Sequence, residues 1–137
     1  MNAKEYLSQA RFLDARINAK IKQLDRLNTL ATNATSVLSG MPHSPNRGTS
    51  KLETIIVKIV DLQEEINHDI DELVDLKRAI VTLIKQIPSD EQQAVLEKRY
   101  LNYQPWEQIS VDMGYSSQHI FKIHYDALEV CDRLLKR

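Results

Sequence analysis

The chain has little cysteine, glycine or proline: one Cys, three Gly and four Pro among 137 residues. The single cysteine, Cys131, excludes an internal disulfide, so we expect a reducing cytoplasm. Scarce glycine and proline, with abundant Leu, Ile, Ala, Lys and Glu, favour long helices. No apolar run approaches the roughly 18 residues that a membrane span needs, and the first residues do not form a signal segment. We therefore expect no membrane association.

Patterns typical of catalysis or metal binding are also missing. The sequence contains no nucleophile beside a base, no paired catalytic carboxylates, no phosphate-binding glycine loop and no zinc pattern. His119 and His124 are five residues apart, which is off the i, i+4 spacing of two ligands on one helix face. We therefore expect no enzyme, no cofactor and no metal site. The net charge of −1 argues against tight, non-specific binding to nucleic acid by this chain alone.

Two long apolar periodicities fill residues 3–38 and 50–87. Residues 39–50 are rich in glycine and proline and predict a loop, after which Ser50 and Glu53 form a capping box. Pro88 ends the second helix. At about 36 residues, or roughly 54 Å each, the two helices favour an antiparallel hairpin. The apolar positions of the second are Leu52, Ile55, Ile59, Leu62, Ile66, Ile70, Leu73, Leu76, Ile80, Leu83 and Ile87.

The second helix has more apolar surface than one partner helix can cover. Apolar residues are doubled along it, and its charges over residues 61–75 are all acidic, whereas the first helix is mainly basic. Either the C-terminal region folds back on this surface, or two hairpins form a four-helix bundle. We favour a homodimer formed through residues 50–87. The doubled positions are Ile55/Ile56, Ile59/Val60, Leu73/Val74 and Leu83/Ile84.

The last 50 residues contain the signals of three short helices. Ser89 begins a helix that we expect to reach about Tyr100, and Pro105 suits the first turn of the next. Gly114 suits a tight turn with positive φ, and Ser116 caps the last helix. This spacing is typical of a helix-turn-helix. We expect the core-facing residues to be Trp106, Ile109, Met113, Ile120, Ile123, Ala127, Leu128 and Val130 or Leu134.

The joint spacing of this segment points to a known family. The segment contains, in order, Val95-Leu96, Arg99-Tyr100, Trp106-Glu107-Gln108-Ile109 and Tyr115-Ser116. These are followed by apolar residues at positions 120, 123, 127 and 128. Together they resemble region 4 of bacterial sigma factors. The whole chain, with its Gly40-Met41-Pro42 segment, also resembles a family of small phage and prophage proteins of unassigned function, related to late-gene transcription activators. The resemblance implies the cytoplasm of a bacterial host, with host RNA polymerase as a candidate partner.

The resemblance also implies which residues would read DNA. In sigma region 4 the first exposed residues of the last helix contact the promoter. By position these are Ser117, Gln118 and Lys122, flanked by His119 and Phe121. Glutamine pairs with adenine, lysine with guanine and serine with either, and an apolar ring can contact a thymine methyl group.

Phosphate contacts are implied more weakly. Arg99 resembles a phosphate-contacting position, as does the backbone at the start of the Pro105 helix. Sigma factors present several arginines on the last helix, whereas this one presents only Lys122. Residues 88–137 contain eight acidic and six basic residues. The resemblance therefore implies weak DNA binding, effective beside RNA polymerase or in an oligomer.

The sequence thus predicts an all-α protein: a long, coiled-coil-like antiparallel hairpin over residues 1–87, with a loop at 39–50, then a three-helix DNA-binding unit over residues 88–137. The leading hypothesis is a phage-type transcription regulator that binds double-stranded DNA as a homodimer. One alternative is an adaptor that contacts RNA polymerase or a sigma factor without reading sequence. Another is a terminase-type DNA-recognition subunit. A locally positive face over residues 116–125 would favour DNA, and a neutral face the adaptor.

Overall fold

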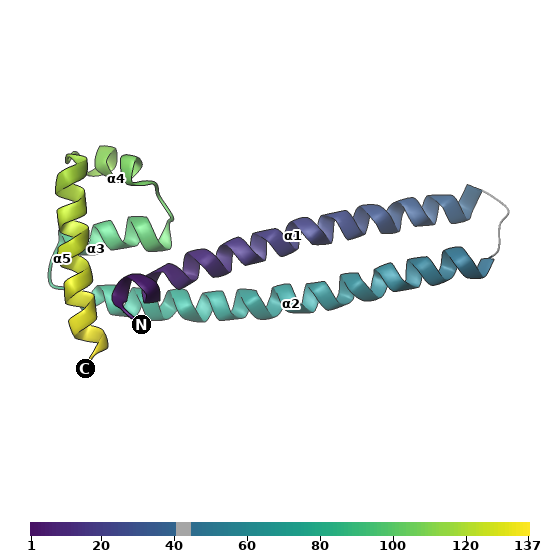
Figure 1. Cartoon of the computed structure of the whole chain (residues 1–137), viewed down its shortest axis with the longest axis horizontal. Helices are drawn as coiled ribbons and strands as arrows, with labels where there is room; N and C mark the ends of the chain where they lie inside the picture. Colours follow the sequence, from purple (N-terminus) through teal and green to yellow (C-terminus); the bar gives the residue numbers. More distant parts are fainter. Residues whose placement is uncertain (41–44) are drawn as a thin grey trace. The chain divides into compact units, whose positions relative to one another are not determined.

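The computed structural model describes residues 1–40 and 45–137, with side chains at 1–34 and 50–137, and all its regular structure is helical (Figure 1). No strand occurs among these residues, so the predicted all-α class is confirmed. The elements are α1 Ala3–Gly40, α2 Pro45–Lys85, α3 Asp90–Leu96, the π-helical turn η1 Glu97–Leu101, α4 Trp106–Met113 and α5 Ser117–Leu135.

The predicted loop over residues 39–50 is too long. Helix α1 continues to Gly40 and α2 begins at Pro45, while residues 41–44 lie outside the described residues. Proline is well suited to a first helical position, because its φ is already helical and its missing N–H has no partner there. The predicted cap at Ser50 is therefore wrong, since Ser50 lies inside α2 and its carbonyl accepts from Thr54 Oγ1 at 2.9 Å.

The chain divides into two compact units, each described separately. The first, called here the terminal unit, contains residues 1–14 and 72–137, and the second, the hairpin unit, contains residues 15–71. Both long helices continue from one unit into the other. The proposed functional division into residues 1–87 and 88–137 stays a prediction.

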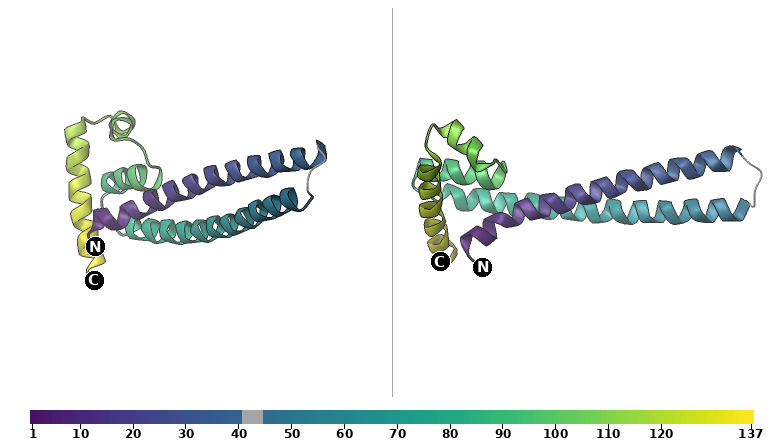
Figure 2. Two further views of the ribbon diagram at one scale, coloured as in Figure 1. Left: turned by 45° about the vertical axis from the view of Figure 1, so that its right-hand side comes forward. Right: turned by 45° about the horizontal axis from the view of Figure 1, so that its top comes forward.

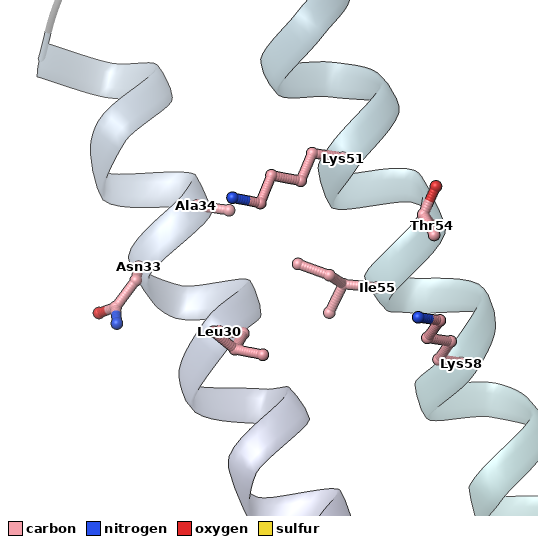
Figure 3. Close-up of a pocket in the computed structure, with 7 residues that line it drawn as sticks. All are labelled: Leu30, Asn33, Ala34, Lys51, Thr54, Ile55 and Lys58. Carbon is pink, nitrogen blue, oxygen red and sulfur yellow. The ribbon is translucent and has the colours of Figure 1, made fainter.

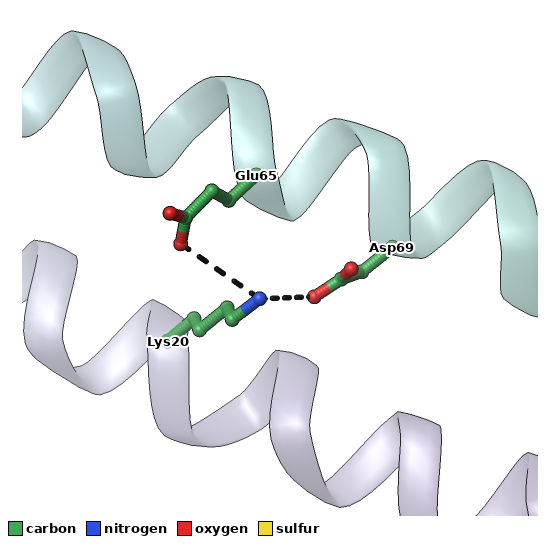
Figure 4. A network of polar contacts seen from close by, with 3 residues as sticks. All are labelled: Lys20, Glu65 and Asp69. Atoms are coloured by element: carbon green, nitrogen blue, oxygen red, sulfur yellow. Dashed lines mark hydrogen bonds and ion pairs between the residues drawn. The ribbon is translucent and has the colours of Figure 1, made fainter.

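The hairpin unit is an antiparallel helix pair with an ion pair in its apolar seam. Ile55, Leu62 and Ile66 are buried at heptad-like steps, and the next position in that series is Asp69, only 4% exposed. Its Oδ2 lies 2.6 Å from Lys20 Nζ, and Glu65 Oε2 lies 3.8 Å from the same nitrogen (Figure 4). Ile70, which the sequence predicts on the apolar stripe of α2, is 39% exposed in the single chain. The Lys20 hydrogen bond holds the pKa of Asp69 below its ordinary value, against the opposing effect of burial.

We predict that Lys20→Met lowers the melting temperature more than the double variant Lys20→Met/Asp69→Leu. The single variant leaves a buried carboxylate without its cation, whereas the double variant replaces the pair by apolar surface of similar volume. Thermal unfolding followed by circular dichroism measures the difference. Glu65→Gln is the control: its side chain is 60% exposed and its pairing is long, so it should melt close to wild type. A double variant that melts as low as Lys20→Met would contradict the prediction.

In the terminal unit, α5 packs against both α3 and α4 (Figure 2). One core cluster joins α3, α4 and α5 through Val95, Ile109, Ile120 and Ile123. A second cluster includes residues from both ends of the chain. Its buried members are Ala3, Leu7, Ala10, Ile80, Leu83, Ile84, Ile87, Leu96, Tyr100, Ala127 and Cys131. The partly buried residues against these cores include Trp106, Met113, Leu128, Val130 and Leu134, so the predicted inner faces are confirmed.

The predicted caps and turn of the C-terminal helices are also confirmed. Ser89 Oγ accepts from the Gln92 amide at 3.3 Å, and Ser116 Oγ accepts from the His119 amide at 3.2 Å. Gly114 ends α4 with φ 70°, a left-handed conformation that costs glycine little. These three positions fix where α3 and α5 begin and where α4 turns towards α5.

Candidate nucleic-acid interface

The first two turns of α5 present a polar surface because of how its core face is spaced. Ile120, Ile123, His124 and Ala127 are buried, so residues 117–119, 121 and 122 lie outside the core-facing stripe. Four of the predicted DNA contacts, Ser117, Gln118, His119 and Lys122, are exposed, and Phe121 is 48% exposed. The structure therefore brings these five sequence-predicted residues together on one accessible surface, called here the α5 face.

The turn before α5 is braced from two sides. The Tyr115 ring meets the His119 ring edge-on, with centroids 4.5 Å apart, and Tyr115 Oη donates to Glu91 Oε1. The Ser110 hydroxyl donates to the carbonyl of Tyr115. These contacts hold the N-terminus of α5 to α3 and α4, so the α5 face is presented by a supported turn.

Trp106 connects the α5 face to the interior of the terminal unit. Its ring meets Phe121 edge-on at 5.2 Å and His124 at 4.5 Å between centroids. On another side, Arg99 Cζ lies 4.6 Å from the Trp106 ring centroid, a cation–π contact. Trp106 therefore packs in the core, as the sequence predicted. It also contacts both Arg99 and Phe121, so it links Arg99 to the α5 face.

Arg99, the predicted phosphate contact, is held in place by its own neighbours. It is partly buried, and its Nη1 donates to the Gln104 carbonyl at 3.0 Å. Burial, and after it the positive charge of Arg11, lower the pKa of the guanidinium. One nitrogen and one face of the guanidinium are thus engaged, and the side chain has a fixed orientation before any ligand arrives.

The sequence did not predict the π-helical turn that carries Arg99. The expected helix to Tyr100 ends instead as α3 at Leu96, and residues 97–101 form η1 with the Asn102 amide donating to the Glu97 carbonyl at 3.1 Å. Tyr103 follows at φ 59°, unusual for a residue other than glycine, and its Oη donates to the Ala10 carbonyl at 3.3 Å. No local signal for a π turn exists in the sequence, because packing against α1 supplies the support.

His124 was also missed, although a signal for it exists. It lies four residues after Ile120 and is 9% exposed, so it faces inwards with the core residues of α5. Its Nε2 lies 2.6 Å from Tyr100 Oη, and the two rings stack at 5.7 Å. Burial, and after it the positive charges of Lys4 and Arg99, lower the pKa of His124 to about 4, and burial raises the pKa of Tyr100 to about 12.

We predict that His124 makes the protein less stable as the pH falls from 6.5 towards 4. In that interval the unfolded chain binds a proton at His124 while the folded state does not, so the free energy of unfolding falls as the pH is lowered. Uptake of one such proton on unfolding lowers the free energy of unfolding by about 1.4 kcal/mol for each pH unit that the pH falls. Denaturant unfolding at several pH values should show a shallower dependence for His124→Gln.

His119→Gln is the matched control, because His119 is an exposed histidine on the same helix. It should keep the wild-type pH dependence. A wild-type slope that persists unchanged in His124→Gln would contradict the assignment to His124.

A separate cavity of about 450 Å³ lies between α1 and α2 in the hairpin unit (Figure 3). Leu30 and Ile55 point into it from the two helices, with Lys51 beside them. Beyond Leu30, α1 lines the cavity with Asn33 and Ala34, which supply little apolar volume. We read the cavity as a packing gap where the apolar stripe of α1 ends; it contains none of the predicted site residues.

Neither a metal-ligand cluster nor a membrane-spanning helix occurs in the described part of the chain. Within residues 1–40 and 45–137, no three His, Cys, Asp or Glu side chains are grouped as ligands for a metal ion. In the same described residues, no helix is both long and apolar enough to cross a membrane.

Comparison with known proteins assigns the chain to a family. Residues 46–132 match the model of a family described as a protein of unknown function (DUF1492). The chain belongs to this family, which agrees with the predicted family of unassigned function. No curated protein matches the chain, and no solved structure matches it.

Proposed function

We propose that the terminal unit is a DNA-binding module and that the protein regulates transcription by binding double-stranded DNA through the α5 face. The observation that carries the proposal is a helix whose N-terminus is capped by Ser116, positioned by the Gly114 turn and exposed at residues 117–119, 121 and 122. In a helix-turn-helix, this end of the second helix enters the major groove.

The residue types on the α5 face suit base reading. Gln118 can pair with both the N6 and N7 atoms of adenine, and Lys122 can donate to guanine O6 and N7. Ser117 can donate or accept, and the exposed edge of Phe121 can contact a thymine methyl group. His119 is held against Tyr115 and flanks these residues. This set could distinguish A·T from G·C pairs over a few base pairs.

The finer parts of the proposal rest on the sequence resemblance. These are a likeness to sigma region 4, an origin in a phage or prophage, a role in a bacterial host cytoplasm and cooperation with host RNA polymerase. The charge of the α5 face supports the need for a partner, because Lys122 is the only lysine or arginine between residues 100 and 132. A face with one cation gains little from counterion release.

We predict that Gln118→Ala or Lys122→Ala weakens binding to a selected DNA site by about 1–3 kcal/mol. The loss on unrelated DNA should be smaller, most clearly for Gln118→Ala, which removes no charge. Selection of bound fragments, followed by titration with and without RNA polymerase, measures both. Glu129→Ala is the control, since Glu129 is exposed on the same helix two turns beyond Lys122.

A second candidate function is a protein-interaction adaptor. Exposed apolar and aromatic side chains on α4 and α5 favour it: Val111 is 75% exposed and Tyr125 is 65% exposed. If Gln118→Ala and Lys122→Ala leave DNA binding and transcription unchanged while Val111→Ser and Tyr125→Ser abolish activity, the adaptor replaces the DNA reader.

We also propose that α2 mediates a homodimer. Of its doubled apolar positions, Leu83/Ile84 are both buried in the terminal unit, but Ile56, Val60 and Val74 are 46–48% exposed. The series 56, 60, 63, 67, 70 and 74 has heptad spacing, with Gln63 and Asn67 at its centre. A polar residue inside such a seam can fix register and partner number.

We predict that Ile56→Gln/Val60→Gln/Val74→Gln yields a folded monomer. These side chains are half exposed within one chain, so their replacement should disturb association more than folding. Light scattering gives the mass, and circular dichroism confirms the helix content. Val57→Gln is the control, because Val57 is 58% exposed but lies outside the series. A wild-type chain that stays monomeric at high concentration would reject the dimer.

A further inference from the structure

A small cavity in the terminal unit is lined by three cations. Its volume is about 100 Å³, and it lies among α1, η1 and the start of α4. At roughly 30 Å³ for each water molecule, it has room for about three waters or one small oxyanion. The residues that line it are Lys4, Ser8, Arg11, Arg99, Tyr100 and Trp106.

Helix periodicity explains why α1 offers polar groups here. Lys4, Ser8 and Arg11 are spaced i, i+4 and i+7, so they share one face of α1. The neighbouring face carries Ala3, Leu7 and Ala10, none of which has exposed area. Burial of that apolar face fixes the rotation of the helix and directs the polar face towards Arg99.

The positive charges of this cavity are not balanced by acidic groups. No carboxylate lines it, and among the described residues no ion pair is formed by Lys4, Arg11 or Arg99. The cations affect neighbouring groups, because Arg11 lowers the pKa of Arg99 and Lys4 lowers that of His124. An anion in the cavity would relieve this repulsion.

The donors are also oriented for an oxyanion. Arg99 is fixed by the Gln104 carbonyl and the Trp106 ring, and the Ser8 hydroxyl lines the same space. The Tyr100 hydroxyl is already engaged with His124. Two guanidinium groups, an ammonium and a hydroxyl form the donor set that binds phosphate groups in proteins.

We propose that Lys4, Ser8, Arg11 and Arg99 form a binding site for a phosphate group. The group is either a backbone phosphate of DNA or the phosphate of a small molecule. The DNA case rests on the proposed function, since Trp106 connects Arg99 to Phe121 on the α5 face. The phosphate site itself does not depend on that function.

The first experiment uses the full chain and inorganic phosphate. Trp106 is the only tryptophan and lines the cavity, so its fluorescence reports occupancy directly. We expect a saturable change in wild type, at least a tenfold weaker response in Arg11→Gln, and partial recovery in Arg11→Lys. Lys22→Gln is the matched control, because it removes one exposed cation from α1 outside the cavity.

The second experiment measures the salt dependence of binding to duplex DNA. If the group is a backbone phosphate, Arg11→Gln and Lys4→Gln should each reduce the slope of log K against log salt by about one, while Lys22→Gln leaves it unchanged. Both variants should weaken all sequences equally, unlike Gln118→Ala.

The two experiments separate the possible results. Saturable phosphate binding without a DNA effect supports the site and assigns it to a small molecule. A changed salt slope assigns it to DNA, with or without a response to free phosphate. No phosphate response together with unchanged salt slopes overturns the site. If DNA does not bind at all, the proposed function fails, but the fluorescence titration still tests the cavity.

Discussion

The packing of the first turns of α1 into the C-terminal helices is the constraint on which the rest of the terminal unit depends. Ala3, Leu7 and Ala10 lie in one buried cluster with Leu96, Ala127 and Cys131. The contact is fixed at its end by the Ala3 amide, which donates to Asp132 Oδ1 at 2.7 Å, so a residue of α5 caps the first helix. The same contact supports the segment just after η1, since Tyr103 Oη donates to the carbonyl of Ala10.

The sequence predicted the local structure of this chain well because its signals are local. Each correctly predicted feature depends on residues within one or two helical turns. These features are the caps at Ser89 and Ser116, the turn at Gly114 and the apolar faces of α4 and α5. The packing of α1 could not be predicted in this way. Two of its three contacts are alanines, whose small side chains give little periodic signal but allow close approach of helices.

The missed features share a physical cause. Asp69 occupies an apolar heptad position, and its partner Lys20 is 49 residues away in the chain. His124 is buried, and its side chain shares a hydrogen bond with Tyr100 of η1. In both cases a hydrogen bond to one partner, distant in the sequence, allows a polar residue to be buried. A single sequence does not identify that partner. For the candidate site, the five residues of the α5 face could be predicted, whereas the contribution of α1 could not.

The distribution of charge explains why a nearly neutral face could still belong to a DNA-binding protein. Base contacts specify a sequence and phosphate contacts position the protein, and the two tasks need different residues. Here the α5 face offers glutamine, serine and one lysine, while Lys4, Arg11 and Arg99 lie around a cavity behind Trp106. Residues 88–137 alone have an excess of acidic groups, so Lys4 and Arg11 of α1 would add to Arg99 the positive charge that phosphate contacts need. The buried face of α1 brings that charge to the terminal unit, which makes the N-terminal helix part of the candidate site as well as part of the hairpin.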